Sequence, residues 1–241
     1  MSVAPLASTP AASPSWQLAV FDLDGTLVDT QEDLLDSLAE AVGPKDFDSP
    51  ARARARAALH LGMQAMAFAA LGEGPKDPNR MRAIEARYLA VYAARIARKS
   101  RVYPGVTATL RWLRDRGIRL AVCSNKPLAM SRILLEALDL ARWFPVVVGP
   151  ESTGWPKPHP EPLRHAAWES NVPRSRTALI GDSTVDLQCA SAAGMDCWIY
   201  RGGYDPPAAA RATLKFDRFE ELCQPNYWPA VNTRHQRSNA P

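Results

Sequence analysis

Two aspartates, Asp22 and Asp24, directly follow the short apolar run at residues 17–21. Like charges this close repel each other, and no Lys or Arg stands beside them in the sequence, so the pair indicates a bound cation. Gly25, the next residue, lets the backbone approach a ligand closely. Asp-Gly is also a common turn dipeptide, so a plain turn is the alternative interpretation.

Two further polar groups could handle phosphate. Ser124 and Asn125 follow the apolar run at 119–123, and a hydroxyl with free backbone N–H groups before a helix suits phosphate oxygens. The same residues could simply cap that helix. Lys157 lies in a proline-rich stretch at 156–160, where the prolines restrict the backbone and help to fix the direction of the ammonium group. A lone lysine is otherwise a common surface charge.

A last polar group, Asp182, Ser183 and Asp186, follows the apolar run at 177–180. If a helix begins near Ser183, Asp186 lies about one turn from Asp182, and both carboxylates can face one site. Mg²⁺ prefers such oxygen ligands. The alternative is that these residues only cap the helix and favour its first turn.

Together the four groups resemble the four signatures of the haloacid dehalogenase superfamily. They read FDLDGTLVD from Phe21, SNKP from Ser124, KPHP from Lys157 and GDSTVD from Gly181. The resemblance covers residues 16–200, and the stretch at 190–194 is similar to the phosphoglycolate phosphatase branch. It implies a Mg²⁺-dependent phosphatase for a small phosphorylated metabolite, with phosphoglycolate as the first candidate substrate.

The resemblance also implies the role of each residue. Asp22 attacks phosphorus and becomes an aspartyl phosphate, while Asp24 protonates the leaving alkoxide and then activates water. Lys157 neutralises the nucleophile and the phosphoryl oxygens. Ser124 holds the transferred group, and Asn125 is placed beside it as a second substrate-binding residue.

The same resemblance implies a set of metal ligands. Mg²⁺ is held by the carboxylates of Asp22 and Asp182, by the backbone carbonyl of Asp24 and by Asp186 as a further ligand. His159 is expected to be a loop residue, because Asp24 already fills both proton-transfer roles.

The elements that must position these residues form an α/β fold. Short apolar runs alternate with amphipathic helical stretches, which predicts a Rossmann-like, doubly wound parallel sheet. The expected strands are 17–21, 119–123, 145–148, 177–180 and 197–200, and the expected helices are 107–116, 128–138, 161–170 and 184–193.

From residue 30 to residue 102 the sequence predicts no strand and about four helices, with breaks at 43–44, 49–50 and 72–79. This insertion, which resembles a type I cap, leaves the sheet after the first strand and so hangs over the ligand-binding edge. The expected division is a core of 16–29 and 104–224, a cap of 30–103, a disordered tail of 1–15 and a C-terminal tail of 225–241.

Within the cap, His60 is a candidate substrate-binding residue. Gly62 could bring a loop down onto the substrate, or residues 60–63 could be part of an Ala- and Met-rich helix. Arg52, Arg54 and Arg56 could face the site or solvent, and solvent is the default expectation.

Composition limits the protein class. The net charge of +4 and pI near 9.0 indicate a general preference for anions without a nucleic-acid-binding patch. The apolar runs are too short to cross a membrane, and residues 1–15 do not resemble a secretion signal. Four cysteines without CxxC spacing favour reduced thiols in the cytoplasm. The oligomeric state is not indicated.

Several other functions compete with hydrolysis. A phosphomutase shares every core residue and differs in whether the cap admits a second sugar phosphate instead of water. A dehalogenase or a phosphonate-cleaving enzyme is disfavoured because Asp24 is present. A non-catalytic binding protein is disfavoured because Asp22, Asp24, Lys157 and Asp182 are all intact.

Overall fold

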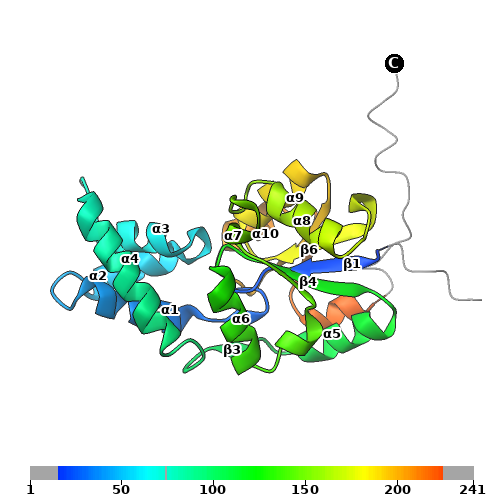
Figure 1. Cartoon of the computed structure of the whole chain (residues 1–241), viewed down its shortest axis with the longest axis horizontal. Coiled ribbons are helices and arrows are strands. Elements are labelled where there is room, and N and C mark those ends of the chain that lie inside the picture. The colour runs from blue at the N-terminus through cyan, green and yellow to red at the C-terminus, as the bar shows by residue number, and fades with distance from the viewer. Residues whose placement is uncertain (1–15, 74, 225–241) are drawn as a thin grey trace, which may run out of the picture.

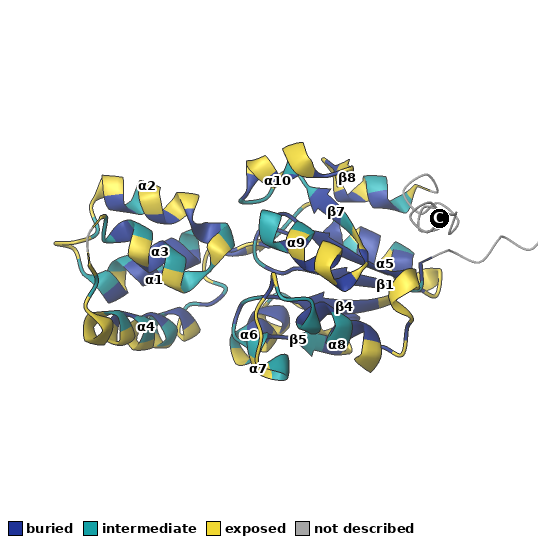
Figure 2. Cartoon of the chain, turned by 90° about the horizontal axis from the view of Figure 1, so that it is seen from above, coloured by how far each residue is buried: buried dark blue, intermediate teal, exposed yellow. Residues whose placement is uncertain are grey.

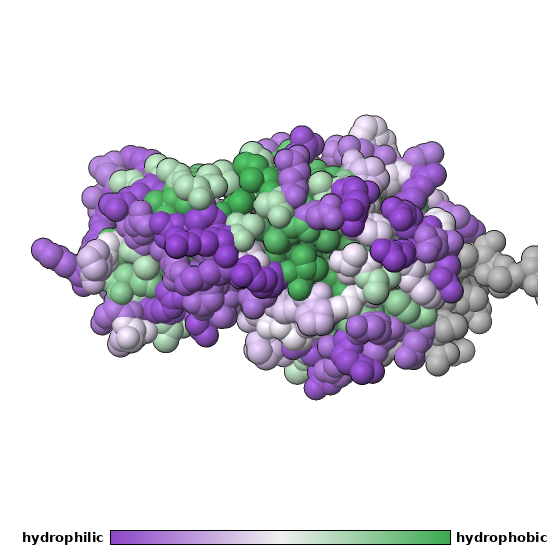
Figure 3. Space-filling view, turned by 90° about the horizontal axis from the view of Figure 1, so that it is seen from below, coloured by the Kyte–Doolittle hydropathy of each residue, from purple (hydrophilic) through white to green (hydrophobic). Residues whose placement is uncertain are grey.

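The computed structural model describes residues 16–73 and 75–224, so the tails expected at 1–15 and 225–241 lie outside the described residues. An α/β lobe and a helical lobe lie side by side, joined by the chain on either side of the helical lobe (Figure 1). Buried residues form the interior of both lobes (Figure 2). Hydrophobic side chains gather on one face beside the junction of the two lobes (Figure 3).

The α/β lobe is built on a six-stranded parallel sheet, in the order β5-β4-β1-β6-β7-β8. Its strands are β1 (Leu18–Phe21), β4 (Arg119–Cys123), β5 (Val146–Val148), β6 (Thr177–Gly181), β7 (Asp196–Tyr200) and β8 (Leu214–Phe216). In the register, Phe21 pairs with Val122 and with Ile180. The polar residues after β1, β4 and β6 therefore meet at one edge, as the sequence predicted.

Helices cover both faces of this sheet because its side chains alternate between two apolar clusters. Phe21 packs in one cluster with α5 (Val106–Asp115) and α6 (Leu128–Ala137), and Val20 packs in the other with α8 (Glu161–Glu169) and α9 (Thr184–Ala193). The predicted doubly wound α/β class is confirmed. The remaining elements of the lobe are α7 (Pro150–Thr153), α10 (Pro206–Arg211), η2 (Ala141–Trp143), η3 (Arg174–Arg176) and η4 (Phe219–Cys223).

The sequence did not predict β8. Its three residues are too few to show a period of two, and Lys215 at its centre is exposed. Within the described sheet it pairs with β7, and its one buried side chain, Phe216, packs in the apolar core beside Tyr200 and Phe219.

The helical lobe contains α1 (Gln31–Val42), α2 (Ser49–Ala57), η1 (Leu59–Leu61), α3 (Met63–Ala70) and α4 (Pro78–Ala93). The sequence predicted four helices and no strand before residue 103. The second part was wrong, because Arg101–Val102 forms β3, which pairs antiparallel with β2 (Val28–Asp29). A two-residue ribbon is too short to leave a sequence pattern. We keep residues 30–103 as the proposed cap.

A buried carboxylate fixes the root of the cap. Asp33 accepts hydrogen bonds from the backbone N–H of Lys99 at 2.9 Å and from the backbone N–H and hydroxyl of Ser100, both at 2.7 Å. These bonds tie the start of α1 to the returning chain. All four cysteines are free, and no helix among the described residues is long and apolar enough to cross a bilayer.

Candidate active site

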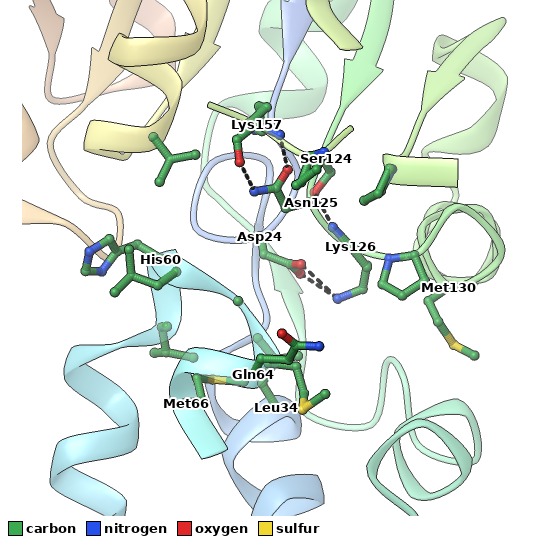
Figure 4. Close-up of a pocket in the computed structure, with 18 of the residues that line it drawn as sticks. Asp24, Leu34, His60, Gln64, Met66, Ser124, Asn125, Lys126, Met130 and Lys157 are labelled. Carbon is green, nitrogen blue, oxygen red and sulfur yellow. Dashed lines mark hydrogen bonds and ion pairs between the residues drawn. The ribbon is translucent and has the colours of Figure 1, made fainter. Parts of the chain in front are cut away.

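A cleft of about 490 Å³ lies between the core and the cap, at the carboxyl ends of the parallel strands. The core side is lined by residues that follow β1, β4 and β6, and the cap side by residues of α1, η1, α3 and α4. Figure 4 shows Asp24, Ser124, Lys126 and Lys157 on one side of it, and Gln64 and others of the cap on the opposite side.

Lys157 is buried between two carboxylates. Its Nζ lies 3.0 Å from Oδ1 of Asp22 and 2.6 Å from Oδ1 of Asp186. Burial alone would lower the pKa of Lys157, but the charges of Asp186 and Asp22 raise it well above the usual value. The ammonium group is therefore held as a cation beside the proposed nucleophile.

Asp186 is itself fixed by the start of α9. Its Oδ2 accepts hydrogen bonds from the Ser183 hydroxyl at 2.6 Å and the Ser183 backbone N–H at 3.1 Å, while Ser183 caps the helix. Ser183 and Asp186 therefore do cap α9, as the alternative interpretation of the sequence expected, and Asp186 also binds Lys157. Because both Asp186 oxygens are engaged, we propose that it positions Lys157, and its direct binding of a metal stays a prediction.

Asp182 is held by two donors from distant parts of the chain. Thr26 donates its hydroxyl hydrogen to Oδ1 at 2.8 Å, and the backbone N–H of Tyr204 donates to Oδ2 at 2.7 Å. Gly25 lies so close that a Cβ atom on it would be 2.5 Å from Oδ2 of Asp182, and its φ of 83° also favours glycine. The expected close approach at Gly25 is thus to this carboxylate.

The donor set fits a divalent cation. One carboxylate oxygen from each of Asp22, Asp182 and Asp186 can be chosen so that all lie within 4.8 Å of one another. Burial, together with the charge of Asp186, raises the pKa of Asp22 to about 6, despite Lys157. Burial and the charges of Asp22 and Asp186 raise the pKa of Asp182 well above its usual value. These carboxylates repel each other in a buried site, and a hard cation with oxygen ligands relieves this repulsion.

Asp24 points away from this cluster, and its carboxylate binds a residue that sequence reasoning missed. Lys126 Nζ lies 2.8 Å from Oδ2 and 3.0 Å from Oδ1 of Asp24, and the Thr30 hydroxyl donates to Oδ1 at 2.8 Å. Lys126 is 7 % exposed. A lysine directly after Ser124 and Asn125 at a strand end was the available signal, but its partner is distant in sequence.

Ser124 and Asn125 are both brought to the cleft, with different contacts. Ser124 is 4 % exposed and lines the cleft near Lys157. The Asn125 amide N–H donates to the Lys157 carbonyl at 2.8 Å, and its carbonyl accepts the Lys157 N–H at 2.7 Å (Figure 4). Because both polar ends of Asn125 bind the Lys157 backbone, we propose that Asn125 braces that loop.

His60 lies in a break between α2 and α3, and not inside a continuous helix. Gly62 has a φ of 89° and precedes the first residue of α3. This geometry favours the loop interpretation of residues 60–63. His60 lines the cleft, and its Nε2 lies 3.9 Å from Oδ2 of Asp205 in the core. Its contact with substrate stays a prediction.

Comparison with known proteins agrees with this geometry. Residues 19–199 match the haloacid dehalogenase-like hydrolase family. A phosphoglycolate phosphatase from Rhodospirillum rubrum is 38% identical over 84% of this chain and 88% of its own length. A Dickeya dadantii protein named probable phosphatase IndB is 34% identical over 85% of this chain and 91% of its own length.

Solved structures show the same fold. The crystal structure of a predicted phosphoglycolate phosphatase from Haemophilus somnus superposes with a TM-score of 0.78 at 25% identity, covering 86% of this chain and 96% of that one. CbbY from Rhodobacter sphaeroides, in complex with phosphate, superposes with a TM-score of 0.74 at 24% identity over 88% of this chain and 99% of that one. The chain therefore belongs to the family of haloacid dehalogenase-like hydrolases.

Proposed function

We propose that this chain hydrolyses small phosphate monoesters through an aspartyl phosphate on Asp22. One observation carries the proposal: Asp22, Lys157 and the ligand candidate Asp182 converge at the floor of a cleft in which Asp24 is a second, separately held carboxylate. A nucleophile and an acid–base group with different surroundings suit a reaction that needs both.

In the first step, a carboxylate oxygen of Asp22 bonds to phosphorus, and the ester P–O bond breaks. Lys157, 3.0 Å from Oδ1 of Asp22, neutralises charge on the nucleophile and the transferred oxygens. The hydroxyl of Ser124 lies in the same cleft and is placed to donate to a phosphoryl oxygen. Positioning and charge neutralisation supply most of the rate enhancement in such transfers.

Mg²⁺ is the proposed metal. The carboxylates of Asp22 and Asp182 would hold it, with the Asp24 backbone carbonyl as a further candidate. When bound, it supplies positive charge for the transferring phosphoryl group. Thr26 and Tyr204 keep Asp182 oriented for this role.

Asp24 is the proposed general acid and general base. As the ester bond breaks, its carboxylic acid protonates the leaving alkoxide. Its carboxylate then takes a proton from water, whose oxygen attacks phosphorus and releases inorganic phosphate and free Asp22. In the structure the carboxylate binds Lys126 and Thr30, and we propose that these two partners position Asp24 for proton transfer.

The names of the relatives support a small phosphate monoester as the substrate. Several relatives are phosphoglycolate phosphatases, and phosphoglycolate is a small phosphate monoester of the class proposed here. A mutase would need room and donors in the cap for a second phosphoryl group.

The test is phosphate release from a panel of monoesters, in Mg²⁺ and in excess chelator. We expect turnover that requires Mg²⁺ and a phosphorylated Asp22 peptide after acid quench of the reaction. Asp22→Asn is expected to abolish both, whereas Asp196→Asn, at an exposed aspartate that begins β7, retains both. Turnover by a folded Asp22→Asn protein would contradict the proposed mechanism.

A further inference from the structure

The cap side of the cleft is largely apolar. In Figure 4, Leu34, Met66 and Gln64 lie across the cleft from Asp24 and Lys126. The apolar cap residues that line the cleft are Leu34, Leu59, Leu61, Met63, Met66 and Leu89. The leaving alcohol of a substrate bound at Asp22 would project toward these side chains.

Positive charge is scarce in this cleft. Among the described residues that line it, arginine is absent, and lysine occurs only in the core, as Lys126 and Lys157. Each is already paired, Lys126 with Asp24 and Lys157 with Asp22 and Asp186. The cap itself contributes a negative charge, Glu85.

The arginines of the cap are used elsewhere. Arg52 lies 2.8 Å from a carboxylate oxygen of Glu32, and Arg56 lies 3.0 Å from the other. Arg54 donates to the backbone carbonyls of Ala69 at 2.8 Å and Ala70 at 2.7 Å. The sequence left open whether these three arginines face the site or solvent. None of the three lines the cleft, and their contacts brace the cap helices.

Apart from Glu85, the cap offers the cleft only a few polar side chains. Tyr92 lines the cleft at 1 % exposure, and its hydroxyl has no hydrogen-bond partner among the described residues. Gln64 adds an amide. His60 Nε2 lies 3.9 Å from Oδ2 of Asp205, and its Nδ1 has no hydrogen-bond partner among the described residues. Neutral donors and acceptors of this kind pair with hydroxyl groups, whereas a carboxylate buried here would lose water without gaining a cation.

From this inventory we propose that the cleft selects phosphate monoesters whose leaving alcohol is uncharged, hydroxyl-bearing and longer than two carbons. Such esters would be favoured over those that carry a second anionic group, phosphoglycolate included. The proposal rests on the proposed function and adds the substrate class. A cleft of about 490 Å³ also leaves a two-carbon acid in contact with few walls.

The first test compares three esters at saturating Mg²⁺: phosphoglycolate, 2-hydroxyethyl phosphate and a pentose 5-phosphate. The first two share the carbon count and differ in charge. We expect kcat/KM to be about tenfold or more lower for phosphoglycolate than for the neutral two-carbon ester, and highest for the sugar phosphate. A preference for phosphoglycolate would overturn the proposal.

The second test introduces a positive charge on the cap side of the cleft. Glu85→Arg is expected to raise the phosphoglycolate to 2-hydroxyethyl phosphate ratio of kcat/KM by about tenfold. Ala86→Arg, at the exposed neighbouring position of α4, should leave the ratio unchanged. An unchanged ratio in a folded Glu85→Arg protein would contradict the proposal.

If Glu85→Arg does not fold, the ranking of the three esters by the unaltered protein decides alone. Failure of the proposed function has a different signature, because a folded protein that binds Mg²⁺ would then hydrolyse none of the three esters.

Discussion

Lys126 and Asp24, 102 positions apart in the sequence, form a two-point ion pair, with Nζ 2.8 Å and 3.0 Å from the two carboxylate oxygens. The same Nζ lies 4.5 Å from the centre of the Tyr92 ring, which belongs to the cap. One core lysine thus contacts both the proposed general acid and the cap helix α4. Movement of the cap would change the surroundings of Lys126 and, through it, of Asp24.

Replacing this lysine is expected to impair proton transfer. Lys126→Met keeps the length of the side chain and removes the charge that holds Asp24. We expect kcat to fall by at least about tenfold on alkyl esters, part of the usual contribution of general acid–base catalysis. Aryl esters, whose leaving group needs less protonation, should lose less.

Steady-state kinetics on a matched alkyl and aryl pair measures this difference, with Lys215→Met on β8, far from the cleft in sequence and contacts, as the control. An equal loss on both esters would mean that Lys126 binds the phosphoryl group and does not position Asp24.

The fold was predictable because its signal is local. Each strand of the sheet's centre is a buried apolar run, such as Leu18–Phe21, followed at once by the polar residue that reaches the site. Parallel strands bring these ends together, so Asp22, Ser124 and Asp182 could be placed at one edge without coordinates.

The contacts between distant segments were not predictable. Nothing around Lys126 indicates that its partner is Asp24, and nothing around Tyr204 indicates that it binds Asp182 and Thr30. Asn125 was assigned to substrate because its type and place suit phosphate, yet its amide meets the Lys157 backbone. Such pairings depend on how loops fold over the sheet edge, which sequence periodicity does not describe.

The two aspartates near the start of α9 are expected to differ in their effect on metal binding. Asp182→Asn should raise the Mg²⁺ concentration needed for half-maximal activity sharply, because Asp182 offers a carboxylate held by Thr26 and Tyr204. Asp186→Asn should mainly lower kcat, because it loosens Lys157. Mg²⁺ titrations of activity, with folding checked by circular dichroism, separate the two. Equal shifts in the Mg²⁺ requirement would make Asp186 a direct ligand.

Stabilisation by Mg²⁺ is expected to depend on pH. Burial raises the pKa of Asp22 to about 6, so between about pH 4 and 6 this carboxyl binds more protons in the folded, metal-free protein than in the unfolded chain. The contribution of Asp22 to the stability therefore falls as the pH rises through this window. Mg²⁺ competes with those protons, so its effect on Tm should be small at pH 5 and larger at pH 7.

Thermal unfolding with and without Mg²⁺ at each pH measures this effect, and Ca²⁺ serves as a comparison ion. Asp182→Asn should weaken the Mg²⁺ effect at every pH. An increase in Tm that is the same at pH 5 and pH 7 would contradict a site built on Asp22.

The last prediction concerns Tyr204, which joins the metal-ligand candidate to the chain that enters the cap. Its backbone N–H donates to Asp182 at 2.7 Å, while its hydroxyl accepts the Thr30 N–H at 2.6 Å and donates to Asp29 at 3.1 Å. Tyr204→Phe removes only the hydroxyl contacts. The free energy of unfolding should fall by about 1 kcal/mol, the scale of one net hydrogen bond. Turnover should fall because Thr30, which holds Asp24, loses its brace. The Mg²⁺ requirement should not change, because the backbone contact to Asp182 remains.

Tyr200→Phe, in the neighbouring aromatic cluster with Phe216, is the matched control and should retain turnover. A Tyr204→Phe protein with normal turnover but a raised Mg²⁺ requirement would show that the hydroxyl acts through Asp182 and not through Thr30.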